Sequence, residues 1–285
     1  MQSAYESMQV KYERHEQLCD DTLLSLTSNK EKWLDFLNTS SRMYKYNFEE
    51  QVMIYAQRPD CKACADFKFW TSPTKMNRHL KRRTRGIALL DRDSQKLYYV
   101  YAMEDTEGRP NGKSKDPENY IWTLPESEDA RNSINASLCN LNRTTSDSFE
   151  GTISALARNA AEYKLCDFTS EFEKGYSHIQ PKESKREVYE NFKQLVIASA
   201  AYMSALRTGA DTSEILKNPV FDKVTYFEGT EFAALVGEAS VSTAEVVLRQ
   251  IEKTVNEYKR HERSAENDRV QLLGGRSKSD NRELN

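Results

Sequence analysis

The chain has few cysteines, few histidines and no long apolar segment. Its five cysteines are odd in number and scattered, which argues against a disulfide framework and favours a reducing cytoplasm. The longest uncharged apolar-rich run, residues 195–206, is too short to span a bilayer. No basic stretch followed by an apolar one stands near the N-terminus, so we expect no secretory signal and no membrane partner.

The side-chain arrangements of common hydrolases are also missing. The four histidines are His15, His79, His178 and His261, and none has a second histidine four residues away, so the H-E-x-x-H zinc motif is absent. No Ser/His/Asp arrangement or acid–base pair stands out. We therefore expect no catalytic residue, no metal and no cofactor.

One cysteine motif needs its own interpretation. The spacing Cys61-x-x-Cys64 matches half a zinc site or a redox pair. No second pair of cysteines or histidines completes four ligands, and Cys139 and Cys166 are distant in sequence. We interpret Cys61 and Cys64 as two buried small residues near the start of a helix.

Positive charge is concentrated in one short segment. The whole chain has a net charge of -3, which by itself says nothing in favour of nucleic acid. Residues 75–92, however, contain seven Lys and Arg residues and one acid, so the rest of the chain is strongly acidic. Such segregation is what a local anion-binding site requires.

The apolar pattern predicts an α+β fold. Helical spacing indicates helices around residues 33–37 and 48–55, the second ending before Pro59. Two β-type runs at 87–90 and 96–103, joined by a polar turn, predict a hairpin, while 77–80 is expected to be a turn and 105–119 a loop. Further helices are expected near 134–141, 153–163, 185–207 and 242–260, with Gly209 ending the third.

We expect N-terminal helices packed on a small antiparallel sheet, followed by a mainly helical domain. Residues 1–29 are interpreted as a flexible or helical arm, 30–125 as the first domain, and 126–260 as the helical domain. Residues 261–285 are charged and lack periodicity, which is typical of a disordered tail or a linker to a further module.

Several spaced segments resemble the N-terminal domain of ArdC-type antirestriction proteins. These are WLDFL at 33–37, YKYNF at 44–48, QVMIYAQRP at 51–59, then Ala63, Trp70 and TRGI at 84–87. The resemblance covers residues 30–104, and it is closest to the version at the front of large proteins of Firmicute conjugative elements. It implies binding of single-stranded DNA without sequence preference, in mobile-element transfer or antirestriction.

A weaker resemblance covers the C-terminal half. Residues 192–206 and 242–258 are similar to the last helices of the zincin-like domain that follows in ArdC-type proteins. The chain departs from that pattern at the missing zinc motif, so the resemblance implies a zincin-like fold without the peptidase ligands.

Single-stranded DNA needs cationic side chains along a groove and flat aromatic faces for stacking. The candidates for these roles are Tyr44, Lys45, Arg58, Trp70, Lys75, Arg78, Lys81, Arg82, Arg83, Arg85, Tyr99 and Tyr101. Because side chains alternate along a strand, Tyr99 and Tyr101 share one face and Tyr98 lies on the other. The plain alternative is a solvated charged loop beside a hairpin with buried tyrosines.

Some of these assignments stay open at this point. Trp33, Phe48 and Tyr55 are expected in the core, whereas Tyr46 and Gln57 fit either the core or the groove.

Two other functions remain as alternatives. The acidic helical half suits a protein-interaction module for a restriction or DNA-processing protein, and His178 with carboxylates suits a metal-dependent peptidase with a non-standard ligand set.

Overall fold

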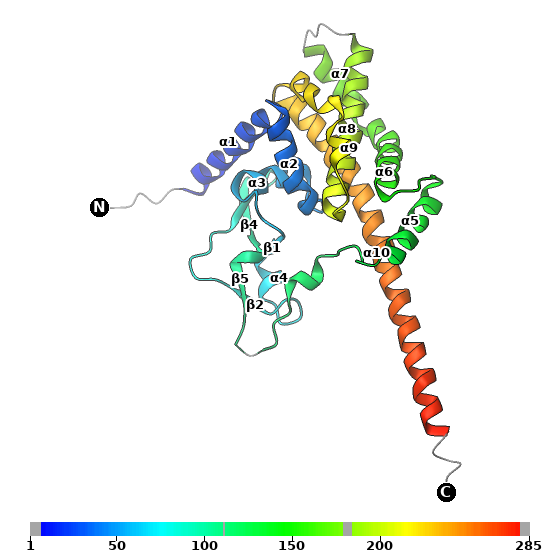
Figure 1. Cartoon of the computed structure of the whole chain (residues 1–285). Coiled ribbons are helices and arrows are strands. Elements are labelled where there is room, and N and C mark those ends of the chain that lie inside the picture. The colour runs from blue at the N-terminus through cyan, green and yellow to red at the C-terminus, as the bar shows by residue number, and fades with distance from the viewer. Residues whose placement is uncertain (1–6, 111, 179–183, 280–285) are drawn as a thin grey trace.

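A computed structural model describes residues 7–110, 112–178 and 184–279 of the chain (Figure 1). Its α-helices are α1 (Met8–Leu26), α2 (Lys30–Met43), α3 (Phe48–Gln57), α4 (Phe67–Thr71), α5 (Glu128–Asn142), α6 (Phe149–Lys164), α7 (Thr169–His178), α8 (Lys185–Thr208), α9 (Ser213–Leu216) and α10 (Thr230–Ser279). Its strands are β1 (Cys64–Asp66), β2 (Arg78–Leu80), β3 (Ile87–Asp91), β4 (Lys96–Ala102) and β5 (Thr106–Gly108). Short 3₁₀ helices are η1 (Met103–Asp105), η2 (Pro117–Tyr120), η3 (Leu165–Phe168) and η4 (Pro219–Phe227).

Helix α2 links the N-terminal part to the helical part. Asn29 caps it by accepting a hydrogen bond from the backbone N–H of Lys32, which satisfies one of the free donors at a helix start. Trp33, with Phe36 and Leu37, is fully buried, and α2 packs against both α3 and α8. The Trp33 indole N–H donates to the Ser199 hydroxyl at 3.0 Å inside the core. The prediction that Trp33 serves packing is therefore confirmed.

Helix α3 covers the sheet and protects its edge. Asn47 and Glu50 form a capping box at its start, and Phe48 is buried on its inner face. At its other end, the Gln57 amide donates to the Ala88 carbonyl at 2.8 Å and accepts from the Ala88 N–H at 3.0 Å. Strand β3 is the edge of its sheet, so this amide takes the place of a missing strand. Gln57 is thus a structural residue.

The strands form the predicted hairpin and two further pairings that local sequence does not show, one of them in a separate two-stranded sheet. Strands β3 and β4 form the antiparallel hairpin, and β1 adds to the other side of β4. Residues 78–80, expected to be a turn, are strand β2, which pairs with β5 inside the segment expected to be a loop. Each of these two strands is three residues long, and they lie about 28 residues apart in sequence. Neither strand is therefore long enough to show an alternation that predicts it.

The helical part is built around α8, which contacts α2, α6 and α10. Ser199 and the alanines beside it are buried, and their small side chains allow these helices to approach closely. Gly209 ends α8 with φ +70°, as its position predicted. The expected fold class, N-terminal helices on a small antiparallel sheet followed by a mainly helical part, is confirmed.

Helix α10 is longer at both ends than its apolar pattern indicated. It begins at Thr230, not near residue 242, because its first turns are buried on several sides and show no single apolar stripe. Gly237 lies there under the Phe48 ring, where an added Cβ would come within 2.2 Å of the ring. Its C-terminal end continues to Ser279 through most of the segment expected to be a disordered tail (Figure 1).

Buried apolar residues from both predicted domains share one core. The larger cluster joins Phe36, Ile54 and Val100 to Phe192 and Ile251. A small second cluster is formed by Trp70 of α4, Met76 and Met103 of η1. No helix of the described part is both long and apolar enough to cross a membrane.

Candidate nucleic-acid interface

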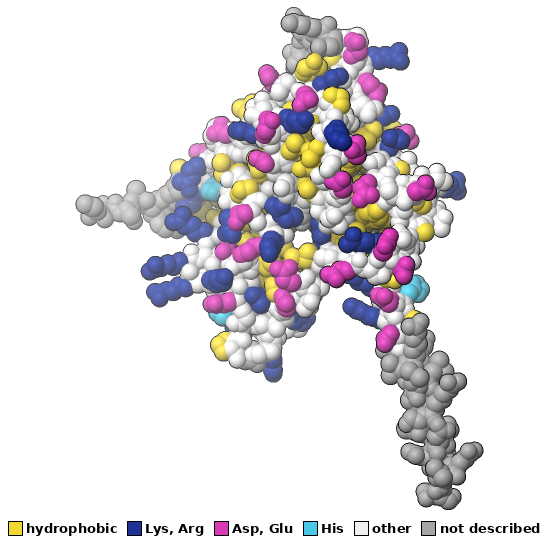
Figure 2. Space-filling view, viewed as in Figure 1, with side chains coloured by type: hydrophobic (Ala, Val, Ile, Leu, Met, Phe, Trp, Pro, Cys, Tyr) yellow, Lys and Arg dark blue, Asp and Glu magenta, His cyan; other side chains and the backbone are white. Residues whose placement is uncertain are grey.

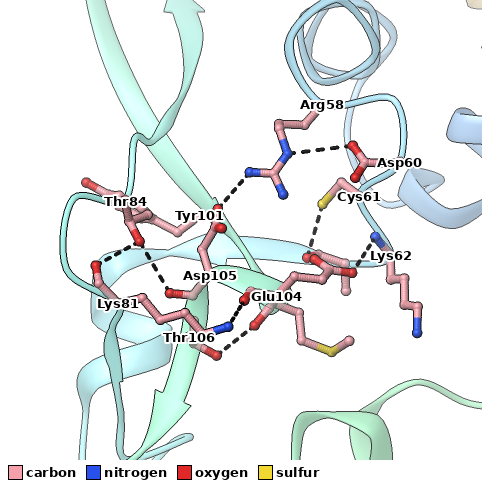
Figure 3. Close-up of polar contacts among 12 residues, drawn as sticks. Arg58, Asp60, Cys61, Lys62, Lys81, Thr84, Tyr101, Glu104, Asp105 and Thr106 are labelled. Carbon is pink, nitrogen blue, oxygen red and sulfur yellow. Dashed lines mark hydrogen bonds and ion pairs between the residues drawn. The ribbon is translucent and has the colours of Figure 1, made fainter.

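The loop between β2 and β3, residues 81–86, contains four of the eight expected cationic residues, Lys81, Arg82, Arg83 and Arg85. The Lys81 N–H donates to the Asp105 carbonyl at 2.8 Å, and the Thr84 hydroxyl donates to the Lys81 carbonyl at 2.8 Å (Figure 3). Between them Arg83 has a left-handed backbone, φ +67°. A non-glycine residue in this region costs about 1–2 kcal/mol, so these anchoring contacts hold the loop in an unfavourable turn.

Three arginines on this loop are exposed to solvent. Arg82, Arg83 and Arg85 are exposed, and within the ranges that the structure describes none of them makes a hydrogen bond or ion pair. Lysine and arginine side chains project at the left edge of Figure 2, the side on which Figure 1 places the loops of the sheet. The three guanidinium groups are therefore available to an external anion.

Arg58, Arg78 and Lys81, three of the other cationic candidates, are tied to the protein. Arg58 pairs with Asp105 at 2.8 Å and with Asp60 at 3.6 Å, so its charge is already neutralised (Figure 3). Lys81 donates to the Glu104 carbonyl at 2.7 Å, and Arg78 donates to the Thr106 hydroxyl at 2.8 Å. The acceptors of Arg78 and Lys81 are neutral, so both side chains keep their charge while their positions are fixed.

Lys75 is exposed but lies in the turn between α4 and β2, away from the 81–86 loop in sequence. Arg92, which contributes to the basic run, is paired with Glu16 and Glu49. The positive field of residues 75–92 is thus smaller than its composition indicates, because the ion pairs of Arg92 neutralise it. The remaining positive charges of this run are those of Lys75, Arg78, Lys81, Arg82, Arg83 and Arg85.

Tyr44 and Lys45 do not belong to this surface. Tyr44 is only 3% exposed, and its hydroxyl donates to Glu252 on α10 at 2.7 Å. It also accepts from the Trp122 indole N–H at 2.8 Å, and Lys45 forms an ion pair with Glu252 at 2.7 Å. Burial raises the pKa of Glu252, but the hydrogen bonds from Lys45 and Tyr44 outweigh burial and lower the pKa. The expected groove residues here are a structural link between α2 and α10.

Tyr46 is structural as well. Its hydroxyl donates to the Cys64 carbonyl at 2.9 Å, and burial is the main cause that raises the pKa of this phenol. Tyr55 packs edge-on against Phe36 with ring centroids 5.7 Å apart, as expected for a core residue.

Trp70 was expected to offer a stacking face and does not. It is 2% exposed, and its indole N–H donates to the carbonyls of Ala65 and Tyr101 at 3.1 and 2.9 Å. An indole buried in this way holds α4 against β1 and β4 and has no face left for a base.

Two tyrosines of β4 and a phenylalanine at the start of α4 have rings that reach solvent. Tyr99 is 44% exposed, and Tyr101 is half-buried with its ring centroid 6.3 Å from that of Phe67. Phe67 is 55% exposed and was missed by the sequence reasoning. Asp66 caps α4 by accepting from the Phe69 N–H, which starts the helix at Phe67 and leaves this ring outside the cluster that buries Trp70. The sequence signal that could have identified Phe67 is the capping residue Asp66 followed by the sequence FKFW at 67–70.

The loop and the aromatic rings meet at Gly86. A Cβ placed on Gly86 would lie 3.0 Å from the Cβ of Tyr99 and 3.1 Å from Cε1 of Tyr101, so the loop backbone lies directly against both side chains. Tyr98 is on the opposite face, with its hydroxyl donating to Glu50, as strand alternation predicted. We define the arginine–aromatic surface as Arg82, Arg83, Arg85, Phe67, Tyr99 and Tyr101.

The ligands of the alternative peptidase are not assembled in the described part of the chain. Among its residues, no group of three or more His, Cys, Asp or Glu side chains is placed to hold a metal ion. His178 is the last residue of α7, and its side chain lies outside the described residues. His79 forms an exposed ion pair with Glu107 at 2.9 Å, provided that its ring is protonated.

Comparison with known proteins adds no further evidence. No family model matches the chain, and no curated protein and no solved structure was found to match it.

Proposed function

We propose that the chain binds single-stranded DNA, without sequence preference, through the arginine–aromatic surface. The observation that supports this most strongly is the contact of the Gly86 backbone with Tyr99, which is exposed, and with Tyr101. The same loop contains Arg82, Arg83 and Arg85, for which the described part of the chain provides no hydrogen-bond or ion-pair partner. Cations that follow the phosphates and rings on which bases stack are the two components of non-specific single-strand binding.

The surface favours single strands over duplexes for a physical reason. Bases are available for stacking only where they are not already paired and stacked within a helix, so Phe67 and Tyr99 add affinity only for a single strand. Arginines on an exposed loop contact phosphates, which carry no sequence information. Every base has a flat face, so stacking does not discriminate strongly among them.

The resemblance to ArdC-type N-terminal domains supports the same function. On that resemblance we propose a role in protecting or handling mobile-element DNA, in the cytoplasm, with no catalytic step performed by this chain. A restriction or DNA-processing protein would be a second partner in such a role.

Fluorescence anisotropy tests the proposal with a labelled 30-nucleotide single strand and the matching duplex. We expect tighter binding of the single strand, weakening as salt rises. Two single strands of equal length and different composition should bind alike. Absence of binding at low salt, or a preference for the duplex, would contradict the proposal.

A further inference from the structure

A cavity of about 670 Å³ lies where the N-terminal part of the chain meets the helical part. Its lining comes from the end of α2, from residues 62–65, from α4, from residues 117–122 and from the end of α8. Its volume is within the range of sites that bind small organic molecules, about 300–1,000 Å³. The cavity is therefore large enough for a ligand bigger than a simple ion.

Aromatic and apolar side chains form most of the cavity walls. Three of the aromatic rings are accessible to a ligand: Tyr46 and Phe69 are half-buried, and Tyr120 is 55% exposed. The Tyr46 hydroxyl and the Trp122 indole N–H are each held by a hydrogen bond inside the protein. Flat rings held in fixed positions suit a planar aromatic group such as a nucleobase.

The charged side chains of the lining are mostly positive. There are four cations and one acid: Arg42, Lys45, Lys62, Arg207 and Glu118. Lys45 is already paired with Glu252 outside the cavity at 2.7 Å, and Lys62 lies 3.8 Å from the Glu118 carboxylate. The positive charge that remains comes from the two arginines.

Both arginines keep their charge because their acceptors are neutral. The guanidinium carbon of Arg207 lies 4.1 Å from the centroid of the Trp122 ring, and its Nη2 donates to the Trp122 carbonyl at 2.7 Å. Arg42 donates to two backbone carbonyls and one side-chain amide oxygen. Both side chains are half-buried, and among the described residues neither forms an ion pair. A half-buried guanidinium without a carboxylate partner stabilises a bound anion.

From these contacts we propose that the cavity binds a nucleoside monophosphate, with its base among the aromatic rings and its phosphate at Arg207 and Arg42. At pH 7 a phosphate monoester carries a charge of about −1.5 to −2, which matches two guanidinium groups. The planar fork of an arginine also fits phosphate oxygens. A free mononucleotide and the 5′-terminal nucleotide of a phosphorylated strand present the same chemistry. The proposal does not depend on DNA binding at the arginine–aromatic surface.

The test is isothermal titration calorimetry of the full chain with adenosine 5′-monophosphate, adenosine and inorganic phosphate. We expect one monophosphate per chain, and weaker binding of adenosine and of phosphate because each lacks half of the ligand. Arg207→Gln should weaken the monophosphate by at least about tenfold and leave adenosine unchanged, because hydrogen bonds to charged groups are worth that factor. Tyr120→Ala should weaken both by about fivefold or more.

Two matched controls lie on α6, where Arg158 and Tyr163 are exposed. Arg158→Gln and Tyr163→Ala should bind all three compounds as the original chain does. Circular dichroism shows whether each variant is folded, and Tyr120→Ala, at an exposed ring, keeps the test decisive if Arg207→Gln is not.

The proposal fails if the original chain does not bind the monophosphate, or binds it no more tightly than inorganic phosphate. It also fails if folded Arg207→Gln loses adenosine and the monophosphate equally, or if indole-3-acetate, an aromatic carboxylate, binds more tightly than the monophosphate. Competition with short single strands identifies the source of the ligand. Displacement by a 5′-phosphorylated strand alone indicates a strand end, and displacement by neither strand indicates a free nucleotide. Equal displacement by phosphorylated and unphosphorylated strands would contradict the phosphate contact.

Discussion

Replacing Arg82, Arg83 and Arg85 together by alanine should change the salt dependence of DNA binding by a calculable amount. Each phosphate contact contributes about 0.7 to the slope of log affinity against log salt for a single strand. Three arginines that have no partner among the described residues therefore predict a slope smaller by about 2 in the variant. Between 50 and 200 mM salt, the original chain should lose about twentyfold more affinity than the variant does.

The assay is anisotropy of a labelled 30-nucleotide strand at four salt concentrations. The matched control removes the same charge elsewhere, by changing the exposed residues Arg158, Arg186 and Lys253 to alanine, and should leave the slope unchanged. Changing the three loop arginines to lysine keeps the positive charges that would contact the phosphates, so it should also preserve the slope. An equal loss of slope in both alanine triples would show that total charge matters and that the loop is not the contact, which refutes the reasoning.

Three further predictions concern single residues. Tyr99→Ala should weaken single-strand binding by about 1–3 kcal/mol, measured by anisotropy; Tyr98→Ala, on the opposite face, should not, and equal losses would contradict the stacking role. Trp70→Ala should lower the free energy of unfolding in urea by about 3–5 kcal/mol, because it empties a buried site; unchanged stability would contradict its burial. Glu252 has a lowered pKa when folded, so its contribution to stability is present above its unfolded pKa and is lost as pH falls through the folded pKa. Urea unfolding from pH 7 to pH 3 should therefore show a smaller pH dependence in Glu252→Gln, and identical curves would show that the links to Lys45 and Tyr44 contribute nothing.

Local sequence patterns correctly predicted the elements whose structure depends on residues close together in the sequence. The apolar spacing around Trp33 and Phe48 predicted α2 and α3, and the two β-type runs predicted the hairpin of β3 and β4. Alternation along β4 also placed Tyr98 and Tyr99 on opposite faces. In these cases the periodicity of one segment determines which side chains face the core.

The remaining features depend on residues far apart in the sequence. In the sequence, Tyr44 and Lys45 resemble part of an aromatic and basic groove. In the structure both side chains bind Glu252, which is more than 200 residues away. The acids that pair with Arg92 lie on α1 and α3. Trp70 is buried because β2 and β5 form a second small sheet beside it, and two three-residue strands leave no readable pattern.

The most direct test of single-strand binding at the arginine–aromatic surface is photo-crosslinking. A single strand carrying a photoreactive pyrimidine is bound to the original chain and irradiated, and the crosslinked peptides are identified by mass spectrometry. We predict crosslinks in the peptides that contain Phe67 and Tyr99, and their loss when Arg82, Arg83 and Arg85 are changed to alanine. Crosslinks confined to the helical part, from α5 to α10, would contradict the assignment of the surface.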